Sequence, residues 1–212
     1  MFTGLVTDVG RIAEIEDTNG VRRLTIESRY PLDQLAMGAS IMHAGVCLTL
    51  VEFGALAGKN GHGGGSWWSI DAVPETLRLT TLGELGVGAR LNLEQSLKLG
   101  EELGGHLVSG HVDGVGEVIS VVPEGDSKRI RISMPEPLAG FVALKGSIAV
   151  DGTSLTVAGV GKDEGVHWFE VAAIPHTLEV TTLGESAPGR RVNLEIDMLA
   201  RYVARMLEFK SE

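Results

Sequence analysis

The chain repeats one long segment at a fixed distance, and this repetition limits what it can fold into more than any other feature. Residues 73–94 read VPETLRLTTLGELGVGARLNLE and residues 174–195 read IPHTLEVTTLGESAPGRRVNLE, with 13 of 22 positions identical at an offset of 101. Agreement over that length is not a chance event, so the same structural unit is predicted twice. Most of the segment is expected to be scaffold, with Gly83 and Gly184 supplying the positive φ of a tight turn.

Shorter segments upstream repeat in the same order. GLVTDVG at 4–10 matches GHVDGVG at 110–116, RRLTIES at 22–28 matches KRIRISM at 128–134, and GASIMHAGVCLTL at 38–50 matches KGSIAVDGTSLTV at 145–157. A chain of 212 residues accommodates two domains of about 100 residues each. We therefore divide it into a first domain at 1–97, a second domain at 98–196 and a tail at 197–212.

Within each half, the hydrophobic pattern is that of short strands. Alternating or β-branched runs such as RLTIES, CLTLVEF and RLNLE are separated by turn residues, and the chain contains 29 glycines. This spacing favours an all-β barrel or sandwich in each half over βαβ units. The tail differs, because Leu199, Val203, Met206 and Leu207 recur at helical spacing with charged residues elsewhere around the wheel. The tail is predicted to be an amphipathic helix that packs against other chains.

Charge and cysteine content exclude several classes of protein. The net charge is −10 and no basic cluster is present, so binding to nucleic acid is not expected. The N-terminus does not resemble a signal peptide, and the longest apolar tract is interrupted by polar residues and glycines, so no membrane association is expected. Cys47 is the only cysteine, which is typical of a reducing compartment. We expect a soluble, cytoplasmic protein.

The two copies differ in chemically directed ways. On balance, groups that can exchange protons are more frequent in the second copy, with the counterexamples His43/Val150, Asp8/Gly114 and Asp71/Ala172. The pairs that carry the trend are Leu5/His111, Gly38/Lys145, Ala44/Asp151, Cys47/Ser154 and Ser96/Asp197. Two similar pockets with unequal equipment suit a reaction in which two similar molecules play different parts. We expect the first half to bind ligand alone and the second half to be needed for turnover.

Six motifs together resemble one known family. They are MFTGLV at 1–6, GVCLT at 45–49, GGHLVSGHVDG at 104–114, KGSIAVDGTSLTV at 145–157, IPHTLEVTTLG at 174–184 and VNLEID at 192–197. In this order, and from the first residue to the terminal helix, they are similar to the riboflavin synthase alpha chain family. The resemblance implies two six-stranded Greek-key β-barrels and a C-terminal helix that assembles a homotrimer. Association with lumazine synthase is a further expectation.

The activity implied by the resemblance is a dismutation. Two molecules of 6,7-dimethyl-8-ribityllumazine exchange a four-carbon unit and give riboflavin and 5-amino-6-ribitylaminouracil. Each barrel is expected to bind one lumazine, and the reacting pair is expected to stack between subunits, with the first barrel of one chain facing the second barrel of another. No cofactor and no metal are implied, because the substrate supplies its own electrophile and its own acidic methyl group.

The resemblance also implies particular residues. Those expected to take part in the chemistry are His111, Ser40, Asp197 and Cys47. Those expected to contact ligand at the first barrel are Phe2, Gly4, Leu5, Val6, Cys47, Leu48, Thr49, Asp71, Ala72, Val73, Pro74, Glu75 and Thr76. Those expected at the second barrel are Gly110, His111, Val112, Lys145, Ser154, Leu155, Thr156, Ile174, Pro175, His176, Thr177, Leu178 and Glu179.

Simpler interpretations stay open for several of these residues. Asp197 precedes the predicted helix, where aspartate is a preferred N-cap, and Cys47 could be only a small buried residue. His106 and His111 lie close together, but a zinc site would need a third ligand nearby.

Two departures from the family pattern are also apparent. Ala44 stands where many relatives carry a polar residue, which would alter a contact in the first pocket. The segment 54–68, GALAGKNGHGGGSWW, reads as a glycine-rich insertion that specifies no site by itself.

Two other functions compete with the dismutation. A non-catalytic lumazine- or flavin-binding antenna protein would need only one competent pocket, whereas both copies here keep a full set of motifs. A flavin reductase would need a nicotinamide-binding domain, for which this chain has no room.

Overall fold

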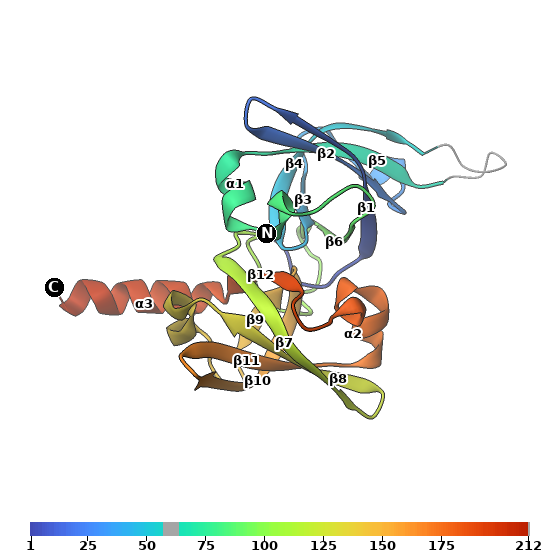
Figure 1. Ribbon diagram of the computed structural model, residues 1–212. Coiled ribbons are helices and arrows are strands. Elements are labelled where there is room, and N and C mark those ends of the chain that lie inside the picture. Colours follow the sequence, from blue (N-terminus) through green and yellow to red (C-terminus); the bar gives the residue numbers. More distant parts are fainter. Residues whose placement is uncertain (57–63, 212) are drawn as a thin grey trace.

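The computed structural model describes residues 1–56 and 64–211 and contains two β-barrels, one above the other in Figure 1. The first barrel closes in the order β1-β2-β5-β4-β3-β6 and the second in the equivalent order β7-β8-β11-β10-β9-β12. All strand pairs are antiparallel. The prediction of an all-β chain built from duplicated six-stranded Greek-key barrels is therefore confirmed.

The strands have closely matched bounds in the two halves. In the first barrel they are β1 (Asp8–Thr18), β2 (Val21–Ser28), β3 (Ser40–His43), β4 (Val46–Ala55), β5 (Ser66–Ala72) and β6 (Arg90–Gln95). In the second they are β7 (Gly114–Glu124), β8 (Ser127–Met134), β9 (Ser147–Val150), β10 (Thr153–Asp163), β11 (Val166–Ala173) and β12 (Arg191–Ile196). The helices are α1 (Pro74–Leu79), α2 (Pro175–Val180) and α3 (Met198–Ser211).

Each barrel is filled by the apolar side chains that alternate along its strands. Leu24, Ile26 and Trp68 are fully buried in the first barrel, and Ile130, Ile132 and Phe169 occupy the second. In each barrel, two strands contain a shift in pairing register. In the first barrel the shifts lie between Ile12 and Glu14 on β1 and between Leu50 and Glu52 on β4. The second barrel has such shifts at the corresponding positions of β7 and β10. Irregularities of this kind bend a strand and increase its twist, which lets a small sheet close.

The repeated TTLG sequences form a short 3₁₀ turn after α1 and α2, but their glycines act differently from the prediction. Gly83 and Gly184 are not among the residues with positive φ. A Cβ atom at Gly83 would instead lie 2.6 Å from the carbonyl oxygen of Leu77, and one at Gly184 would lie 2.2 Å from that of Leu178. These positions need glycine because the turn folds back onto the helix, not because of the backbone dihedral angle.

The two barrels are joined by asparagines from the repeated segment. The Asn92 side chain accepts a hydrogen bond from the Thr182 backbone N–H at 2.8 Å and donates to the Asp151 carbonyl at 2.9 Å. In the mirrored arrangement, Asn193 accepts from the Thr81 N–H and donates to the Ala44 carbonyl, both at 2.8 Å. The repeated segment thus does more than build each barrel, because it also holds the two together.

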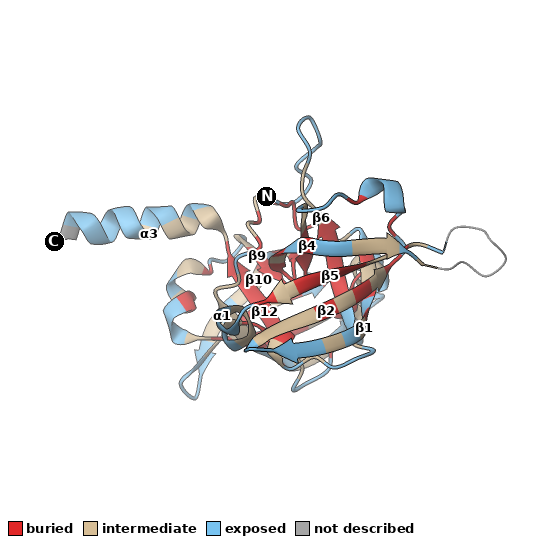
Figure 2. Ribbon diagram, turned by 90° about the horizontal axis from the view of Figure 1, so that it is seen from above, coloured by how far each residue is buried: buried red, intermediate tan, exposed pale blue. Residues whose placement is uncertain are grey.

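The predicted helix in the tail is present as α3, which projects away from both barrels (Figures 1 and 2). It starts directly after Asp197, whose side-chain oxygen accepts a hydrogen bond from the Leu199 N–H at 2.9 Å, so the N-cap prediction is confirmed. Among the described residues, no helix is both long and apolar enough to cross a bilayer.

The glycine-rich segment 54–68, predicted to be an insertion, belongs to strands β4 and β5 at its two ends. Gly54 and Ala55 complete β4, and β5 begins at Ser66 and includes Trp67 and Trp68. The sequence prediction for 54–68 therefore overestimated the irregular connection at both ends, and residues 57–63 lie outside the described part of the chain.

Candidate functional site

Each barrel presents an equivalent surface on the hairpin formed by its third and fourth strands, β3 and β4 in the first barrel and β9 and β10 in the second. Along β4, Val46, Leu48 and Leu50 are buried in the barrel, while the alternate residues Cys47 and Thr49 face outward. Ser40 on β3 lies directly opposite Thr49 in the strand register. We call Ser40, Cys47 and Thr49 the first site.

The second barrel repeats this surface on β9 and β10. Ser154 and Thr156 alternate with buried neighbours along β10, and Ser147 lies opposite Thr156. We call Ser147, Ser154 and Thr156 the second site.

Both sites are bordered by a segment from the other half of the chain. The Gly4 carbonyl accepts a hydrogen bond from the Ser154 N–H, and the Gly110 carbonyl accepts one from the Cys47 N–H, both at 2.8 Å. Both glycines have positive φ. A Cβ atom at Gly4 would lie 2.5 Å from the Cβ of Ser154, and one at Gly110 would lie 2.6 Å from the Cβ of Cys47. Glycine is required at these two positions by backbone conformation and by close approach.

This crossing corrects the assignment made from sequence. The residues 4–6 were grouped with the first barrel and 110–112 with the second, whereas the structure places Gly4 against the second site and Gly110 against the first. Val112 agrees with this arrangement, since it packs on the core of the first barrel. The offset between the copies could not reveal the exchange, because it is the same whether each segment borders its own barrel or the opposite one.

The exchange also changes the distribution of proton-handling groups. His111 directly follows Gly110, whose carbonyl accepts the hydrogen bond from Cys47, so His111 lies next to the first site although it belongs to the second half of the sequence. Its backbone N–H donates to Glu195 at 3.0 Å. The expectation that the second barrel holds most of these groups stays a prediction, with His111 now placed beside the first barrel. An isolated first half would lack His111 and the packing of Val112.

Two glutamates that the sequence analysis did not assign fix the crossing segments. Glu94 accepts hydrogen bonds from the Thr3 N–H and hydroxyl and from the Gly4 N–H, at 2.6 to 3.0 Å. Glu195 accepts from the N–H and hydroxyl of Ser109 and from the N–H groups of Gly110 and His111. Burial raises the pKa of Glu94, and the hydrogen bonds from Thr3 and Gly4 oppose this shift. Each glutamate is the last residue of one copy of the repeated segment. Their occurrence at the same position of both copies is the sequence feature from which their structural role could have been predicted.

His106 was considered only as a metal ligand, but the structure places it beside the second site. Its Nδ1 lies 2.7 Å from the Ser154 hydroxyl, and the residue is 8% exposed. Burial lowers the pKa of His106, while the negative charge of Asp197 acts in the opposite direction. The lowered pKa favours the neutral imidazole, which accepts a hydrogen bond from the Ser154 hydroxyl or donates one to it according to its tautomer. The charge of Asp197 acts on this imidazole, while its side chain caps α3.

The side chains of several residues predicted to contact ligand are buried and cannot reach one. Phe2 is completely buried against Met42, Val108 and Ala149, so it packs between the barrels instead of lining a surface. Leu48, Ala72 and Leu155 also point inward, which leaves only their backbone groups for a ligand.

Asp71 is engaged on the outer face of its barrel. It forms a bidentate ion pair with Arg23, both N–O distances being 2.8 Å, and this pair lowers the pKa of Asp71.

The other predicted residues lie outside the two sites as defined here, mostly on or before α1 and α2. Val73 and Ile174 are 49% and 56% exposed and precede α1 and α2, which contain Pro74, Glu75, Thr76, Pro175, Thr177 and Leu178. Glu75 forms an ion pair with Arg78. Leu5 is about half exposed, and Lys145 is exposed with positive φ.

One cavity gathers predicted residues from both halves. Val6, His176 and Glu179 line a cavity of about 620 Å³ together with Arg29 and Arg90. It therefore lies where the N-terminal segment meets α2, in keeping with the crossing of the segments.

Ala44 does not lie in the first site. It has positive φ, and its carbonyl accepts the hydrogen bond from Asn193, so it belongs to the contact between the barrels. The hairpin turn between β3 and β4 points toward the second barrel here, so the structure gives no support to the expected change of a polar contact in the first pocket.

Known proteins match the whole chain. The lumazine binding domain model matches twice, at residues 3–96 and 109–197. Riboflavin synthase of Brucella abortus (strain 2308) is 48% identical over 210 residues, covering 99% of this chain and all of that protein. Riboflavin synthase of Bacillus subtilis (strain 168) is 34% identical and covers 100% of this chain and 92% of its own length. LumP complexed with 6,7-dimethyl-8-(1'-D-ribityl) lumazine has a TM-score of 0.75 at 25% identity and covers 92% of this chain and 98% of its own.

Two matched domains and two equivalent outward-facing surfaces define a tandem lumazine-binding-domain protein. Full-length identities of 34% to 48% then identify the family, and this chain belongs to the riboflavin synthases. The resemblance first noted in the six motifs is thereby confirmed.

Proposed function

We propose that the chain converts two molecules of 6,7-dimethyl-8-ribityllumazine into riboflavin and 5-amino-6-ribitylaminouracil, the last step of riboflavin formation. The observation that carries the proposal is that both copies retain a complete site, Cys47 and Thr49 on one barrel and Ser154 and Thr156 on the other. A transfer between two like molecules needs two binding surfaces, and each surface here is completed by a segment from the other half.

The protein contributes orientation and proton transfer. Two stacked rings held at reacting distance gain a large rate advantage over free molecules. In the proposed reaction one lumazine loses a proton from its C7 methyl group while its partner is attacked by a nucleophile. Cys47, Thr49, Ser154 and Thr156 anchor the rings.

The candidate proton carriers fall into two groups. Ser40 and His111 serve the first site, and Asp197 serves the second, where His106 is hydrogen-bonded to Ser154. Separate sets at the two sites suit a donor and an acceptor with different protonation needs.

We further propose that α3 assembles a homotrimer. Leu199, Tyr202, Val203, Met206 and Phe209 are 57% to 71% exposed on this helix, and side chains of this size are expected to be covered in the assembly. The reacting pair would then form between the first site of one subunit and the second site of another. A cytoplasmic location and an association with lumazine synthase remain part of the proposal.

A non-catalytic lumazine- or flavin-binding protein is the second candidate, favoured by the likeness to LumP structures. The test is to incubate the purified chain with 6,7-dimethyl-8-ribityllumazine and no other reagent. We expect yellow-green riboflavin fluorescence to appear, with two lumazines consumed for each riboflavin formed. Tight binding of unchanged lumazine without product would support the non-catalytic alternative and contradict our proposal.

A further inference from the structure

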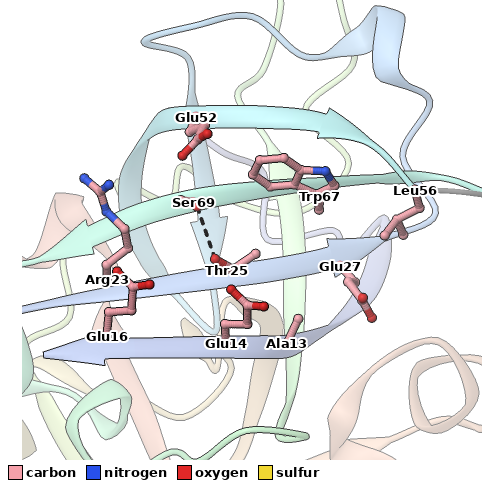
Figure 3. Close-up of a pocket in the computed structure, with 10 residues that line it drawn as sticks. All are labelled: Ala13, Glu14, Glu16, Arg23, Thr25, Glu27, Glu52, Leu56, Trp67 and Ser69. Carbon is pink, nitrogen blue, oxygen red and sulfur yellow. Dashed lines mark hydrogen bonds between the residues drawn. The ribbon is translucent and has the colours of Figure 1, made fainter.

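A groove on the outer face of the first barrel lies apart from both sites. It has a volume of about 420 Å³ and crosses β1, β2, β5 and β4 (Figure 3). We call it the Trp67 groove; it is lined by Ala13, Glu14, Glu16, Arg23, Thr25, Glu27, Glu52, Leu56, Trp67 and Ser69. The segment that supplies Trp67 was predicted from sequence to be a glycine-rich insertion that specifies no site by itself.

Trp67 is held as a flat aromatic platform. A Cβ atom at Gly54 would lie 2.8 Å from the Trp67 Nε1 and 2.9 Å from the adjacent ring carbons, so the indole lies directly over this glycine. Gly54 and Trp67 are register partners on β4 and β5. Because the ring rests on the sheet, its position is set by the backbone beneath it.

The second barrel shows what such a platform binds. Trp168 lies over Gly161 in the same register, and the guanidinium of Arg131 stacks on its ring at 3.9 Å from the centroid. Glu170 and Asp163 hold that guanidinium at 2.9 and 3.1 Å. A cation over an indole face is a favourable electrostatic arrangement, and arginine adds planar stacking to it.

The first barrel has the equivalent tryptophan, Trp67, but no arginine at the position of Arg131. The position of Arg131 is occupied by Thr25, and that of its partner Glu170 by Ser69, which lies opposite Thr25 at an O–O distance of 3.2 Å. Two short side chains thus replace a stacked ion pair, and the groove occupies this region (Figure 3).

Carboxylates surround the platform. Glu27 pairs with Arg11, and Arg23 pairs with Asp71. Among the residues that the structure describes, Glu14, Glu16 and Glu52 form no ion pair. Glu16 and Glu52 also act electrostatically on Arg23, but the carboxylates of the groove outnumber this single lining cation. An aromatic face bordered by an excess of carboxylates complements a planar organic cation.

The identity of the cation that the groove could bind is limited by the ion pairs that the chain's own arginines already form. Every arginine in the sequence forms an ion pair with a carboxylate of the same chain. An arginine of a second copy would exchange its own carboxylate for those of the groove, with no net gain in ion pairs, whereas an unpaired arginine of another protein would gain one. We propose that the Trp67 groove receives an arginine side chain from a different protein, in the position that Arg131 occupies on the second barrel.

The test uses the full-length protein and the peptide acetyl-Gly-Arg-Gly-amide at low ionic strength. We expect saturable shifts of the Trp67 indole N–H signal in two-dimensional NMR, with a Kd of about 1–10 mM for a single side chain. Trp67→Phe assigns that signal. Peptides with lysine or neutral citrulline in place of arginine should bind at least about fivefold more weakly.

Two variants and a control locate the binding. Glu52→Gln should weaken binding about threefold, and Thr25→Arg combined with Ser69→Glu should abolish it by recreating the internal ion pair. Glu164→Gln, on an exposed turn of the second barrel, should change nothing, and riboflavin formation should be unaffected in all three.

Three results of the peptide titrations would overturn the proposal. They are equal binding of the citrulline peptide, no saturable shift up to about 20 mM peptide, and binding that survives both groove variants. Concentration-dependent self-association that the double variant removes would assign the groove to a second copy and would also contradict the proposal.

Discussion

Replacing Asn193 with alanine tests whether the repeated segment holds the two barrels together. The Asn193 side chain is 1% exposed, and its two 2.8 Å hydrogen bonds satisfy the buried Thr81 N–H and the Ala44 carbonyl. The substitution would leave both groups without a partner, and each such group costs about 1–3 kcal/mol. Allowing for partial relaxation, we expect the free energy of unfolding to fall by about 3 kcal/mol.

The assay is urea denaturation, followed by circular dichroism at one fixed protein concentration, because assembly makes apparent stability depend on concentration. With an m-value of about 3 kcal/mol/M for a chain of this size, the midpoint should fall by about 1 M. Asn92→Ala, the mirrored change, should cost a similar amount because it leaves the Thr182 N–H and the Asp151 carbonyl without their side-chain partner. Gln34→Ala on an exposed turn serves as the control. A loss below about 0.5 kcal/mol for Asn193→Ala would show that the barrels do not depend on this contact.

Three further predictions follow from single features. Cys47→Ser should keep turnover within about tenfold, because Ser154 already places a hydroxyl at the equivalent position, whereas a lost general acid or base costs about 10²–10⁴. Deleting residues 202–212 should give smaller species in sedimentation together with lower riboflavin formation, and a fully active trimer would contradict the role of α3. Burial raises the pKa of Asp151 to about 6 against the opposing charge of Arg190. Because the unfolded value is lower, Asp151 should stabilise the fold less as the pH rises from about 4 to 6, by at most about 3 kcal/mol. Denaturation of Asp151→Asn across this range should lack that trend, and an unchanged pH profile would refute the assignment.

The hydrophobic alternation and the internal repeat were sufficient to predict the fold class. A period of two with frequent turn residues specifies strands, and a 22-residue segment written twice specifies two copies of one domain. The terminal helix was predicted equally well, because its apolar stripe and the aspartate before it are local signals. Cys47, Thr49, Ser154 and Thr156 were also predicted from sequence, and the structure places them at equivalent outward-facing positions, while their role at the ligand stays a prediction.

The tertiary structure alone decided which residues share a site. Gly110 lies 63 residues beyond Cys47 in the sequence, and Gly4 lies 150 residues before Ser154, yet each pair is brought together by the crossing of two segments between barrels. Periodicity cannot report such an exchange, because local side-chain patterns are the same whether a segment borders its own barrel or the other one. The Trp67 groove was hidden for the same reason, since the exchange of Arg131 for Thr25 between the copies becomes meaningful only when Thr25, Ser69 and Trp67 are seen on neighbouring strands. Contacts between distant segments depend on how the chain closes in space, and that closure is what a one-dimensional pattern leaves open.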